Sequence, residues 1–470
     1  MSIQKMFVFL HDNYILCKMK NSVLNRYKSV SAMLLMLVAV AFAGCITDEE
    51  TEVTPECYIT GLTIKDIKSA YHQPAYDGSD SVTYRTISGG TIKFHIDQLK
   101  GVITSVDSLP NWTDLTEVYP TFSYTGVIFA RKKAYMGDDM YYAFNNGTDS
   151  VNFTHPVEFM VVGSDGISTK HYWVSINKSS IASDSLVWAD VKDHNLSLTD
   201  NSQLIVKNGQ FYAFTDESGT LKVCTSANAK DWTTPTTLTG FAKPIDIQSV
   251  CIFKDSFYAL GADGQIYSSA EGTAWTAASA EKAVKLLGAD KYYIYIFDGT
   301  NILASKDLTN WEVNGDKDIE MIPETNISLI SYATKTNTAL QASVLTGLTS
   351  KNTNAATVWY KISADDELTN QSWNYIKVTS ENPYPLPYLE GLEVFPFEGE
   401  LYAMGAGNSV FYRSSDNGIT WIKLTRHILP PAAVEAGNHA NAVEKDGYIW
   451  MAQRLADGST AVWKGRVNKK

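Results

Sequence analysis

The stretch Ser414-Ser415-Asp416-Asn417-Gly418-Ile419-Thr420-Trp421 decides the fold of this chain of 470 residues. Its last residue is one of six tryptophans that recur along the C-terminal two-thirds of the sequence, and most of the others end a related phrase. The six are Trp188, Trp232, Trp275, Trp311, Trp373 and Trp421. Their spacing of 36 to 62 residues is typical of a repeat array with one structural unit per tryptophan.

The units of this array share an order of short apolar runs that are separated by Gly, Asn and Asp. A Tyr-rich run, such as Phe211-Tyr212-Ala213 or Leu401-Tyr402-Ala403, precedes a run that ends near a serine, and the tryptophan run follows. Alternating runs of this length are typical of strands, and long stripes of helical period are missing after the first 45 residues. The sequence therefore predicts an all-β protein whose C-terminal part is a β-propeller with four strands per blade.

The two ends of the array predict how the ring closes. The last unit contains Tyr448-Ile449-Trp450-Met451 and Ala461–Val467, which leaves it one strand short, and an unmatched tryptophan run, Ser185–Val191, precedes the first unit. If the run with Trp188 docks as the outer strand of the last unit, six blades are complete and an exposed sheet edge disappears. We expect a six-bladed propeller over residues 184–468.

The stretch at 414–421 has the pattern S-x-D-x-G-x-T-W and resembles the Asp-box of β-propellers. The resemblance implies a turn between the third and fourth strands of a blade, on the face opposite the usual binding site. It gives a structural role to Ser414, Asp416, Gly418 and Trp421, with the side-chain oxygens binding backbone N–H groups and the indole packing between blades. The copies that end at Trp275 and Trp311 are altered, because one lacks the Asp and the other is a residue shorter.

The N-terminus predicts a targeting segment at residues 1–44, with translation starting at Met1 or at Met19. Four basic residues, from Lys18 to Lys28, precede an apolar run at 32–42 that is too short to span a bilayer comfortably. The exit Phe42-Ala43-Gly44-Cys45 resembles the lipobox of bacterial lipoproteins, which implies that Cys45 is acylated and anchors the chain to a membrane. The alternative is a cysteine that happens to follow an ordinary cleavage site.

Residues 45–56 are expected to form a lipidated acidic tether. Its Asp48-Glu49-Glu50 resembles the export tag of Bacteroidetes-type lipoproteins, which implies the outer membrane and exposure at the cell surface; the alternative is a solvated spacer. Residues 57–180 are expected to form a β-sandwich. Its closing hairpin, with strands at 156–162 and 172–176, resembles the last two strands of immunoglobulin-like (Ig-like) modules.

The organisation of the whole chain, with its Trp463-Lys464-Gly465-Arg466-Val467 ending, resembles Bacteroidetes-type surface lipoproteins. These have an N-terminal Ig-like domain and a C-terminal six-bladed propeller with Asp-box or kelch-like repeats. The resemblance implies a location and a shape, and it carries no activity over to this chain.

Charge and cysteine content exclude several classes of function. The formal net charge is −12, and it is more negative without residues 1–44, where five of the six charged residues are basic. Nucleic acid is therefore not an expected partner, because its binding needs a basic surface. The cysteines have no metal-binding or CxxC spacing. A Cys224–Cys251 disulfide is conceivable, but we expect free thiols.

Two enzyme classes that use propellers fit poorly. A sialidase needs three arginines to clamp a carboxylate, and the propeller region holds only Arg413, Arg426, Arg454 and Arg466, two of them in expected third strands. A copper oxidase needs clustered His and Tyr, whereas His194, His427 and His439 are single residues in expected connections. We expect no metal and no cofactor, and no catalytic residue can be assigned. Acidic residues lie in or beside loops of the binding face, at Asp246, Glu320, Glu324 and Glu390.

Two connections on that face carry the candidate ligand-binding residues. The segment Glu381–Tyr388 is rigid and aromatic, so Tyr384 and Tyr388 suit stacking on sugars or packing on a protein; the alternative is that they seal the junction of blades four and five. The segment Thr425–Pro431 would bring Arg426 and His427 toward the central mouth, with Arg454 in a neighbouring loop. The alternative for these residues is loop anchoring by a hydrogen bond.

The sequence favours a lipid-anchored binding protein without enzymatic activity. The Ig-like unit would be a spacer, and the propeller would recognise a glycan or a protein partner. One alternative is a carbohydrate-active enzyme, hydrolase or lyase, with its site at the propeller mouth. Another is a scaffold within an outer-membrane assembly.

Overall fold

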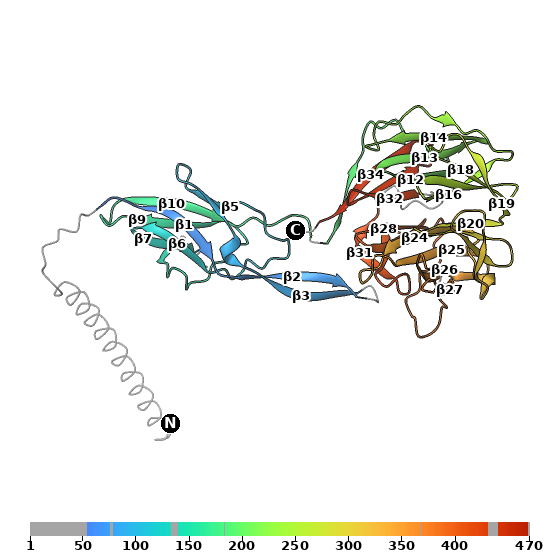
Figure 1. Cartoon of the computed structure of the whole chain (residues 1–470). Coiled ribbons are helices and arrows are strands. Elements are labelled where there is room, and N and C mark those ends of the chain that lie inside the picture. The colour runs from blue at the N-terminus through green and yellow to red at the C-terminus, as the bar shows by residue number, and fades with distance from the viewer. Residues whose placement is uncertain are drawn as a thin grey trace, which may run out of the picture. The chain divides into compact units, whose positions relative to one another are not determined.

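The computed structural model of the chain describes residues 54–75, 79–132, 140–182, 184–366, 368–430 and 440–468. Within them the regular elements are strands, apart from two single helical turns, η1 (Gly89–Thr91) and η2 (Ile319–Met321) (Figure 1). The predicted all-β class is confirmed. No helix in this part of the chain is long and apolar enough to cross a membrane. The predicted signal peptide and Cys45 lie outside the described residues.

The N-terminal region folds around a six-stranded sheet with the strand order β4-β5-β10-β9-β7-β8. A second sheet pairs β1 with β6, and β2 and β3 form an antiparallel hairpin. The bounds are β1 (Tyr58–Ile64), β2 (Ile67–Pro74), β3 (Asp80–Ile87), β4 (Phe94–Asp97), β5 (Val102–Ser105), β6 (Pro120–Thr125), β7 (Val127–Lys132), β8 (Met140–Ala143), β9 (Val157–Val162) and β10 (Thr169–Ser175). The β9–β10 pair corresponds to the hairpin expected at the end of this region. Tyr172 and Val174 of β10 are fully buried, as alternation on a half-buried strand requires.

The C-terminal region consists of six antiparallel sheets of four strands each. The first sheet contains β12 (Ser202–Lys207), β13 (Gln210–Glu217), β14 (Thr220–Ser226) and β15 (Thr236–Thr237), and the second β16 (Ile245–Phe253), β17 (Ser256–Gly261), β18 (Gln265–Ser269) and β19 (Thr276–Lys282). The third contains β20 (Lys285–Ala289), β21 (Ile294–Phe297), β22 (Ile302–Ser305) and β23 (Glu312–Gly315), and the fourth β24 (Thr325–Ala333), β25 (Gln341–Thr349), β26 (Asn352–Ser363) and β27 (Asn374–Tyr375). The fifth contains β28 (Glu393–Phe397), β29 (Glu400–Met404), β30 (Val410–Ser414) and β31 (Ile422–Ile428), and the sixth β32 (Ala440–Lys445), β33 (Tyr448–Arg454), β34 (Thr460–Val467) and β11 (Leu186–Asp190).

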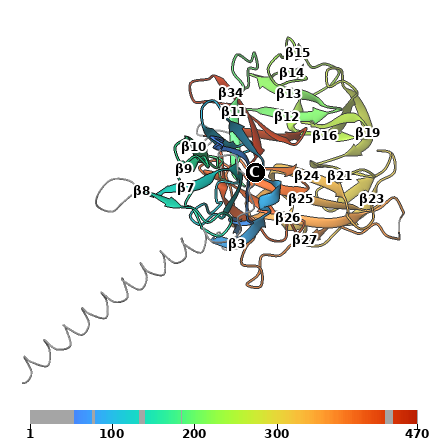
Figure 2. The same ribbon diagram turned by 90° about the vertical axis from the view of Figure 1, so that its left-hand side faces the viewer.

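The six sheets surround a common axis. The innermost strand of each sheet is β12, β16, β20, β24, β28 or β32. Each inner strand contacts the inner strands of both flanking sheets, in the cyclic order β12, β16, β20, β24, β28, β32. Figure 2 shows β12, β16 and β24 toward the middle and β15, β19, β23 and β27 at the rim. This is a β-propeller, as predicted.

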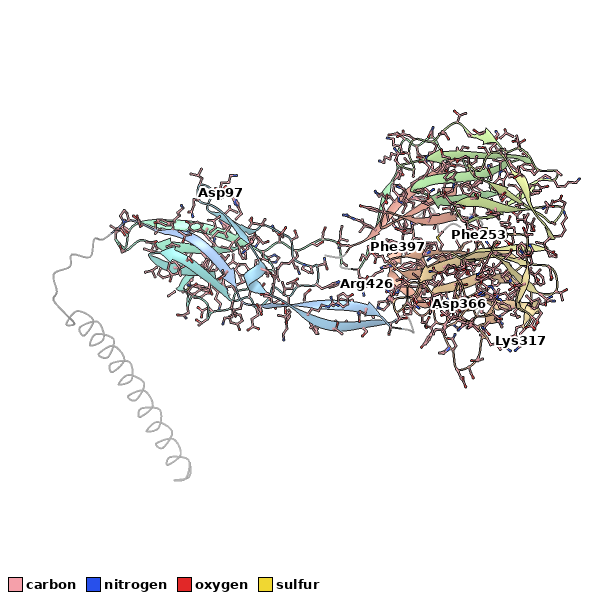
Figure 3. The ribbon with its side chains drawn as sticks, in the orientation of Figure 1. Asp97, Phe253, Lys317, Asp366, Phe397 and Arg426 are labelled. Atoms are coloured by element: carbon pink, nitrogen blue, oxygen red, sulfur yellow. The ribbon has the colours of Figure 1, made fainter. Side chains whose placement is uncertain are left out.

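The hydrophobic core is divided among the spaces between neighbouring sheets, and six buried clusters occupy the six spaces. Side chains such as Phe253 and Phe397, both about 1% exposed, fill these spaces (Figure 3). Stacked sheets about 10 Å apart need large side chains to fill the gap, which explains why the chain is rich in aromatic residues.

Each of the six recurrent tryptophans lies in a different space between sheets. Trp232, Trp275, Trp373 and Trp421 are buried members of four clusters, and Trp311 and Trp188 pack against the other two. The spacing of tryptophans along the sequence is therefore the spacing of interfaces around the ring.

The strand of Trp188 lies where the closure argument places it. β11 pairs antiparallel with β34, with Leu186 opposite Val467 and Trp188 opposite Gly465. The indole Nε1 of Trp188 donates a hydrogen bond to the backbone oxygen of Ile428, at 2.7 Å, which ties β11 to the fifth sheet as well. The segment before the first sheet thus completes the sixth sheet.

The contact between Trp188 and Gly465 gives a first test of this closure. We expect Gly465→Ala to lower the free energy of unfolding by about 1–3 kcal/mol, because overpacking a filled site forces side chains out of their rotamers. The added methyl group would lie 2.6 Å from Cζ3 of Trp188. Denaturant unfolding followed by tryptophan fluorescence measures the loss. In a Trp188→Leu background the loss should largely vanish, and an equal loss in both backgrounds would contradict the close contact.

The stretch at 414–421 forms a compact hydrogen-bonded turn between β30 and β31. The Ser414 hydroxyl donates to Asp416 at 2.8 Å and accepts from the backbone N–H of Gly418 at 2.9 Å. The Asp416 carboxylate also accepts from the backbone N–H and the hydroxyl of Thr420, and the indole of Trp421 donates to the Gly418 carbonyl. The side-chain oxygens of the turn therefore bind N–H and hydroxyl groups of the same turn.

The altered copies keep part of this turn. Asp307 accepts from the backbone N–H groups of Thr309 and Asn310, which holds its pKa far below the ordinary value. In the copy without an Asp, the hydroxyl of Ser269 accepts from Gly272 N–H, and Trp275 donates to the Gly272 carbonyl. The indole contact to the turn is therefore retained where the carboxylate is lost.

The turn of the fourth sheet departs from this pattern and joins a buried polar network. Ser363, at the equivalent serine position, donates to the carboxylate of Asp290 in the third sheet's first hairpin. The ammonium of Lys361 is fully buried and donates to Tyr295, Asn314 and Asn370 at 2.8–3.0 Å. Burial lowers the pKa of Lys361 to about 8, and the Asp290 charge opposes that shift.

The cysteines of the described residues, Cys57, Cys224 and Cys251, are free thiols. Burial raises the pKa of Cys224 to about 11 and that of Cys251 to about 12. A Cys224–Cys251 disulfide is absent, in agreement with the expectation of free thiols.

Candidate functional site

The inner strands of the propeller begin around a cavity of about 480 Å³, which we call the mouth cavity. Its lining comes from five sheets, because β12, β16, β20, β24 and β28 each contribute residues at or just before their first position. The lining residues are Asp200, Asn201, Gln203, Asp246, Gln248, Ser249, Leu260, Lys285, Leu286, Glu324, Thr325, Asn326, Ile327, Ser328, Gly391, Leu392 and Glu393. Within the described part of the chain no aromatic side chain lines it.

A second cavity of about 500 Å³, the inner cavity, continues along the same strands. Gln203, Gln248 and Glu393 line both cavities, so the two are continuous along the axis of the ring. The lining of the inner cavity also mixes polar and apolar side chains, among them Asp290, Ile205 and Phe395. A ligand that enters at the mouth therefore meets polar groups in both cavities.

The acidic side chains at the mouth are held by the protein. The Asp246 carboxylate accepts from the backbone N–H of Gln248 at 3.0 Å. The backbone N–H and the hydroxyl of Ser350 bind Glu324 at 2.9 and 3.0 Å, and these bonds keep the pKa of Glu324 below its ordinary value. The carboxylates are thus fixed in position at the rim.

Glu393 lies deeper, at the first position of β28, where both cavities meet. Burial raises its pKa to about 8, and a hydrogen bond from the backbone N–H of Ala442 opposes the shift. At neutral pH this side chain therefore carries a proton and can both donate and accept a hydrogen bond.

The cations near the mouth are engaged. The ammonium of Lys285 donates to the backbone oxygen of Glu324 at 2.7 Å. The guanidinium of Arg454, at the end of β33, forms a 2.5 Å ion pair with Asp200, whose side chain is 89% exposed. Arg454 thus contacts a residue of the mouth cavity but is not itself among the residues that line it.

Arg426 and His427 lie elsewhere, and their predicted place in a connection is wrong. Both belong to β31, the outer strand of the fifth sheet, which continues past a register shift until Ile428 pairs with Val410 of β30. The Arg426 side chain is 19% exposed. His427 is 2% exposed and stacks on Tyr402, 5.9 Å away between ring centroids. Neither residue lines the mouth cavity.

The aromatic connection at 381–388 packs between the fourth and fifth sheets. The backbone oxygen of Tyr384 accepts from the backbone N–H of Trp421 at 2.8 Å, and the neighbouring Leu386 is fully buried. Tyr388 bonds through its backbone to Asn354 and remains 40% exposed. Neither tyrosine lines the mouth cavity, and the segment seals the junction, which is the alternative that the sequence left open.

Among the described residues, no group of three or more His, Cys, Asp or Glu side chains could hold a metal ion. His439 of the copper-site argument lies outside these residues.

Family models match both regions of the chain. The model described as the DUF6242 beta propeller domain matches residues 182–470, and the model of the DUF6242 N-terminal domain matches residues 62–176. The chain belongs to the DUF6242 family. The first match ends at residue 176 and the second begins at residue 182.

No curated protein matches the DUF6242 chain. Solved structures with similar folds include an auxiliary nutrient binding protein from Bacteroides ovatus, which is 10% identical, with 74% of this chain and 93% of that chain covered and a TM-score of 0.39. They also include an endo-arabinase from Bacteroides thetaiotaomicron (10% identity, 58% and 94% coverage, TM-score 0.30) and YCF48 from Cyanidioschyzon merolae (12%, 60% and 98%, TM-score 0.31). Similarity this low carries no information about the ligand.

The sequence predicts the acidic rim of the DUF6242 propeller in part. Of the four acidic residues that it places in or beside loops of the binding face, Asp246 and Glu324 line the mouth cavity, whereas Glu320 and Glu390 do not. The sequence analysis does not identify Gln203, Asn326 and Glu393 as site residues. Their place along the sequence could have indicated them, because each is the first or second residue of an inner strand.

Proposed function

We propose that this DUF6242 protein is a lipid-anchored binding protein of the cell envelope whose propeller recognises a glycan or protein ligand at the mouth cavity. In this proposal Cys45 carries the lipid, residues 45–56 are the tether, and the protein faces the outside of an outer membrane. The N-terminal region is an Ig-like spacer, and the six four-stranded sheets are the six blades of the recognition domain.

The observation that carries the proposal is the composition of the mouth cavity. It is concave, it is large enough for a small ligand or a chain end, and polar side chains from five sheets converge on it. These side chains are not needed to close the ring, because the buried clusters and the tryptophans do that. Polar groups concentrated at the axis, where no packing requires them, support a binding role.

A second candidate function is a glycoside hydrolase, and one observation favours it. Glu393 has a raised pKa while Asp246 and Glu324 stand in the same cavity, and one protonated and one ionised carboxyl group are the usual requirement for that chemistry. In that case Glu393 would protonate the leaving oxygen. Release of reducing ends from a bound glycan, lost in Glu393→Gln, would support the enzyme over the binding protein.

The carboxylates of the rim test the binding site itself. We expect the double variant Asp246→Asn, Glu324→Gln to weaken ligand binding at least tenfold, because hydrogen bonds to charged groups contribute about 1.5–3 kcal/mol each. Fluorescently labelled protein on a glycan array, followed by titration calorimetry with the glycans that bind, measures the change. Asp316→Asn, at an exposed position outside the cavity, is the matched control and should bind as the wild type does. Equal affinity of the double variant and the control would refute the mouth cavity as the binding site.

A further inference from the structure

Three partly buried polar side chains on the wall of the mouth cavity make no hydrogen bond within the described part of the chain. They are Gln203 in β12 and Asn326 and Ser328 in β24, strands of the first and fourth sheets. All three are partly buried. By contrast, Gln248 of the same wall donates to Asn201 and to the Ser202 carbonyl, at 3.1 and 2.9 Å, and is held in place. The cavity therefore combines fixed groups with three that are available to a ligand.

The available groups share one chemical property. Carboxamides and hydroxyls both donate and accept hydrogen bonds, and the protonated Glu393 between the cavities does so too. Groups of this kind complement ligand hydroxyls, which also do both. In an alternating network of this sort every donor finds an acceptor, and no charge has to be buried.

Charged ligands fit the cavity less well. An anion would need a free cation to balance its charge, but the ammonium of Lys285 is bound to a backbone carbonyl, and the nearby guanidinium of Arg454 is paired with Asp200. The carboxylates Asp246 and Glu324 would also repel it. A cation would need unengaged carboxylates, whereas Glu324 is already bound by Ser350 and Glu393 is neutral.

Aromatic stacking is not available either, because no aromatic ring of the described residues lines the mouth cavity. A ligand bound in the mouth cavity is held by hydrogen bonds to its edges. A cavity of this kind suits the end of a polymeric ligand that enters along the axis of the propeller, while the rest of the ligand stays outside.

We infer that the mouth cavity binds the terminal residue of an uncharged saccharide, with Gln203, Asn326 and Ser328 as the side chains that read its hydroxyl groups. This inference rests on the proposed function and narrows it from a glycan or protein to a neutral sugar end. The fixed carboxylates Asp246 and Glu324 accept hydroxyl donors at the rim.

The test compares three sets of oligosaccharides of matched length on the purified protein by titration calorimetry. One set is neutral, one ends in a uronic acid, and one ends in an amino sugar with a free ammonium group. We expect neutral members to bind, and the uronic-acid and amino-sugar ends to bind at least tenfold more weakly. The double variant Gln203→Ala, Asn326→Ala should weaken neutral binding at least tenfold, and the control Gln210→Ala, on β13 and outside the cavity, should not change it.

The outcomes separate this inference from the proposed function. The protein could instead bind only charged ends, or a protein ligand, and lose that binding in Asp246→Asn, Glu324→Gln. This result would overturn the neutral-sugar inference and leave the mouth cavity as the binding site. Neutral binding that the Gln203→Ala, Asn326→Ala variant leaves intact would overturn the role of these side chains. Binding that neither double variant affects would overturn both. Circular dichroism and unfolding midpoints equal to those of the wild type show that each variant is folded.

Discussion

Replacing Asp290 by alanine is expected to lower the free energy of unfolding of the propeller by about 3–5 kcal/mol, the range for breaking a buried charge network. Asp290 is 6% exposed, and its carboxylate accepts from the backbone N–H groups of Tyr292 and Tyr293, both at 2.8 Å. It also accepts from the Tyr295 hydroxyl at 2.6 Å and from Ser363. Alanine removes the acceptor of all four donors, and only the Tyr295 and Ser363 hydroxyls, 2.9 Å apart, keep a bond to each other.

The same change removes the negative charge nearest to a fully buried ammonium, that of Lys361. With Asp290 absent, burial lowers the Lys361 pKa below the value of about 8 that it has in the wild type. A lysine whose pKa is depressed on folding adds stability as pH rises from the folded pKa toward the unfolded value near 10.5, because the unfolded chain then holds the extra proton. The stability of Asp290→Ala should therefore begin to rise at a lower pH than that of the wild type.

Denaturant unfolding at several pH values between 6 and 9 measures both effects. Asp316→Ala, at an exposed position on the same part of the chain, should change stability by less than about 0.5 kcal/mol. Adding Lys361→Met to Asp290→Ala should recover part of the loss and remove its pH dependence. A loss below about 1 kcal/mol for Asp290→Ala would show that this network does not hold the third and fourth sheets together.

Glu393→Gln is expected to stabilise the protein by about 3 kcal/mol above pH 8 and to change little below pH 4.5. The folded-state pKa of Glu393 is raised to about 8, against 4.5 in the unfolded chain. The stability that protonation contributes is complete below the unfolded pKa and is lost as pH rises through the folded pKa, at about 1.4 kcal/mol for each unit of difference. The expected value is smaller than the full difference because the mouth cavity and the inner cavity leave the Glu393 side chain partly open to solvent.

Thermal unfolding of wild type and Glu393→Gln at pH 4.5, 6.5 and 8.5 checks this, and the melting curves should separate only at the higher values. Asp316→Asn, at an exposed position, is the control for removing one negative charge from an acidic protein. Curves that separate equally at all three pH values would mean that Glu393 is ionised throughout. A carboxyl group kept at the axis at such a cost is typical of a site retained for function, not for stability.

The fold was predictable from the sequence because it is repeated locally. Each tryptophan and its turn recur in one sheet after another. The run with Trp188 belongs to no repeat unit, and the last unit lacks a strand, so this run was expected to complete the sixth sheet. The position of Arg426 and His427 was predicted wrongly because Pro430-Pro431 indicates a loop but does not say where it begins. The strand continues to Ile428 because Leu424 and His427 both point into the core.

The candidate site was only partly predictable because it is assembled across the ring. Gln203 and Asn326 are more than 100 residues apart, and neither stands in a motif; they share a cavity because both begin inner strands. Tyr384 and Tyr388 carried the stronger chemical signal in the sequence. Their segment instead seals a junction, because Leu386 and Leu389 within it complete the core of the fourth and fifth sheets.

A structure of the protein with a bound neutral oligosaccharide tests the central claim most directly. We expect the terminal sugar in the mouth cavity, with its hydroxyl groups within hydrogen-bonding distance of Gln203 and Asn326 and the remainder of the chain leading outward. A sugar bound on Tyr384 and Tyr388 instead, with the mouth cavity unoccupied by ligand, would contradict it.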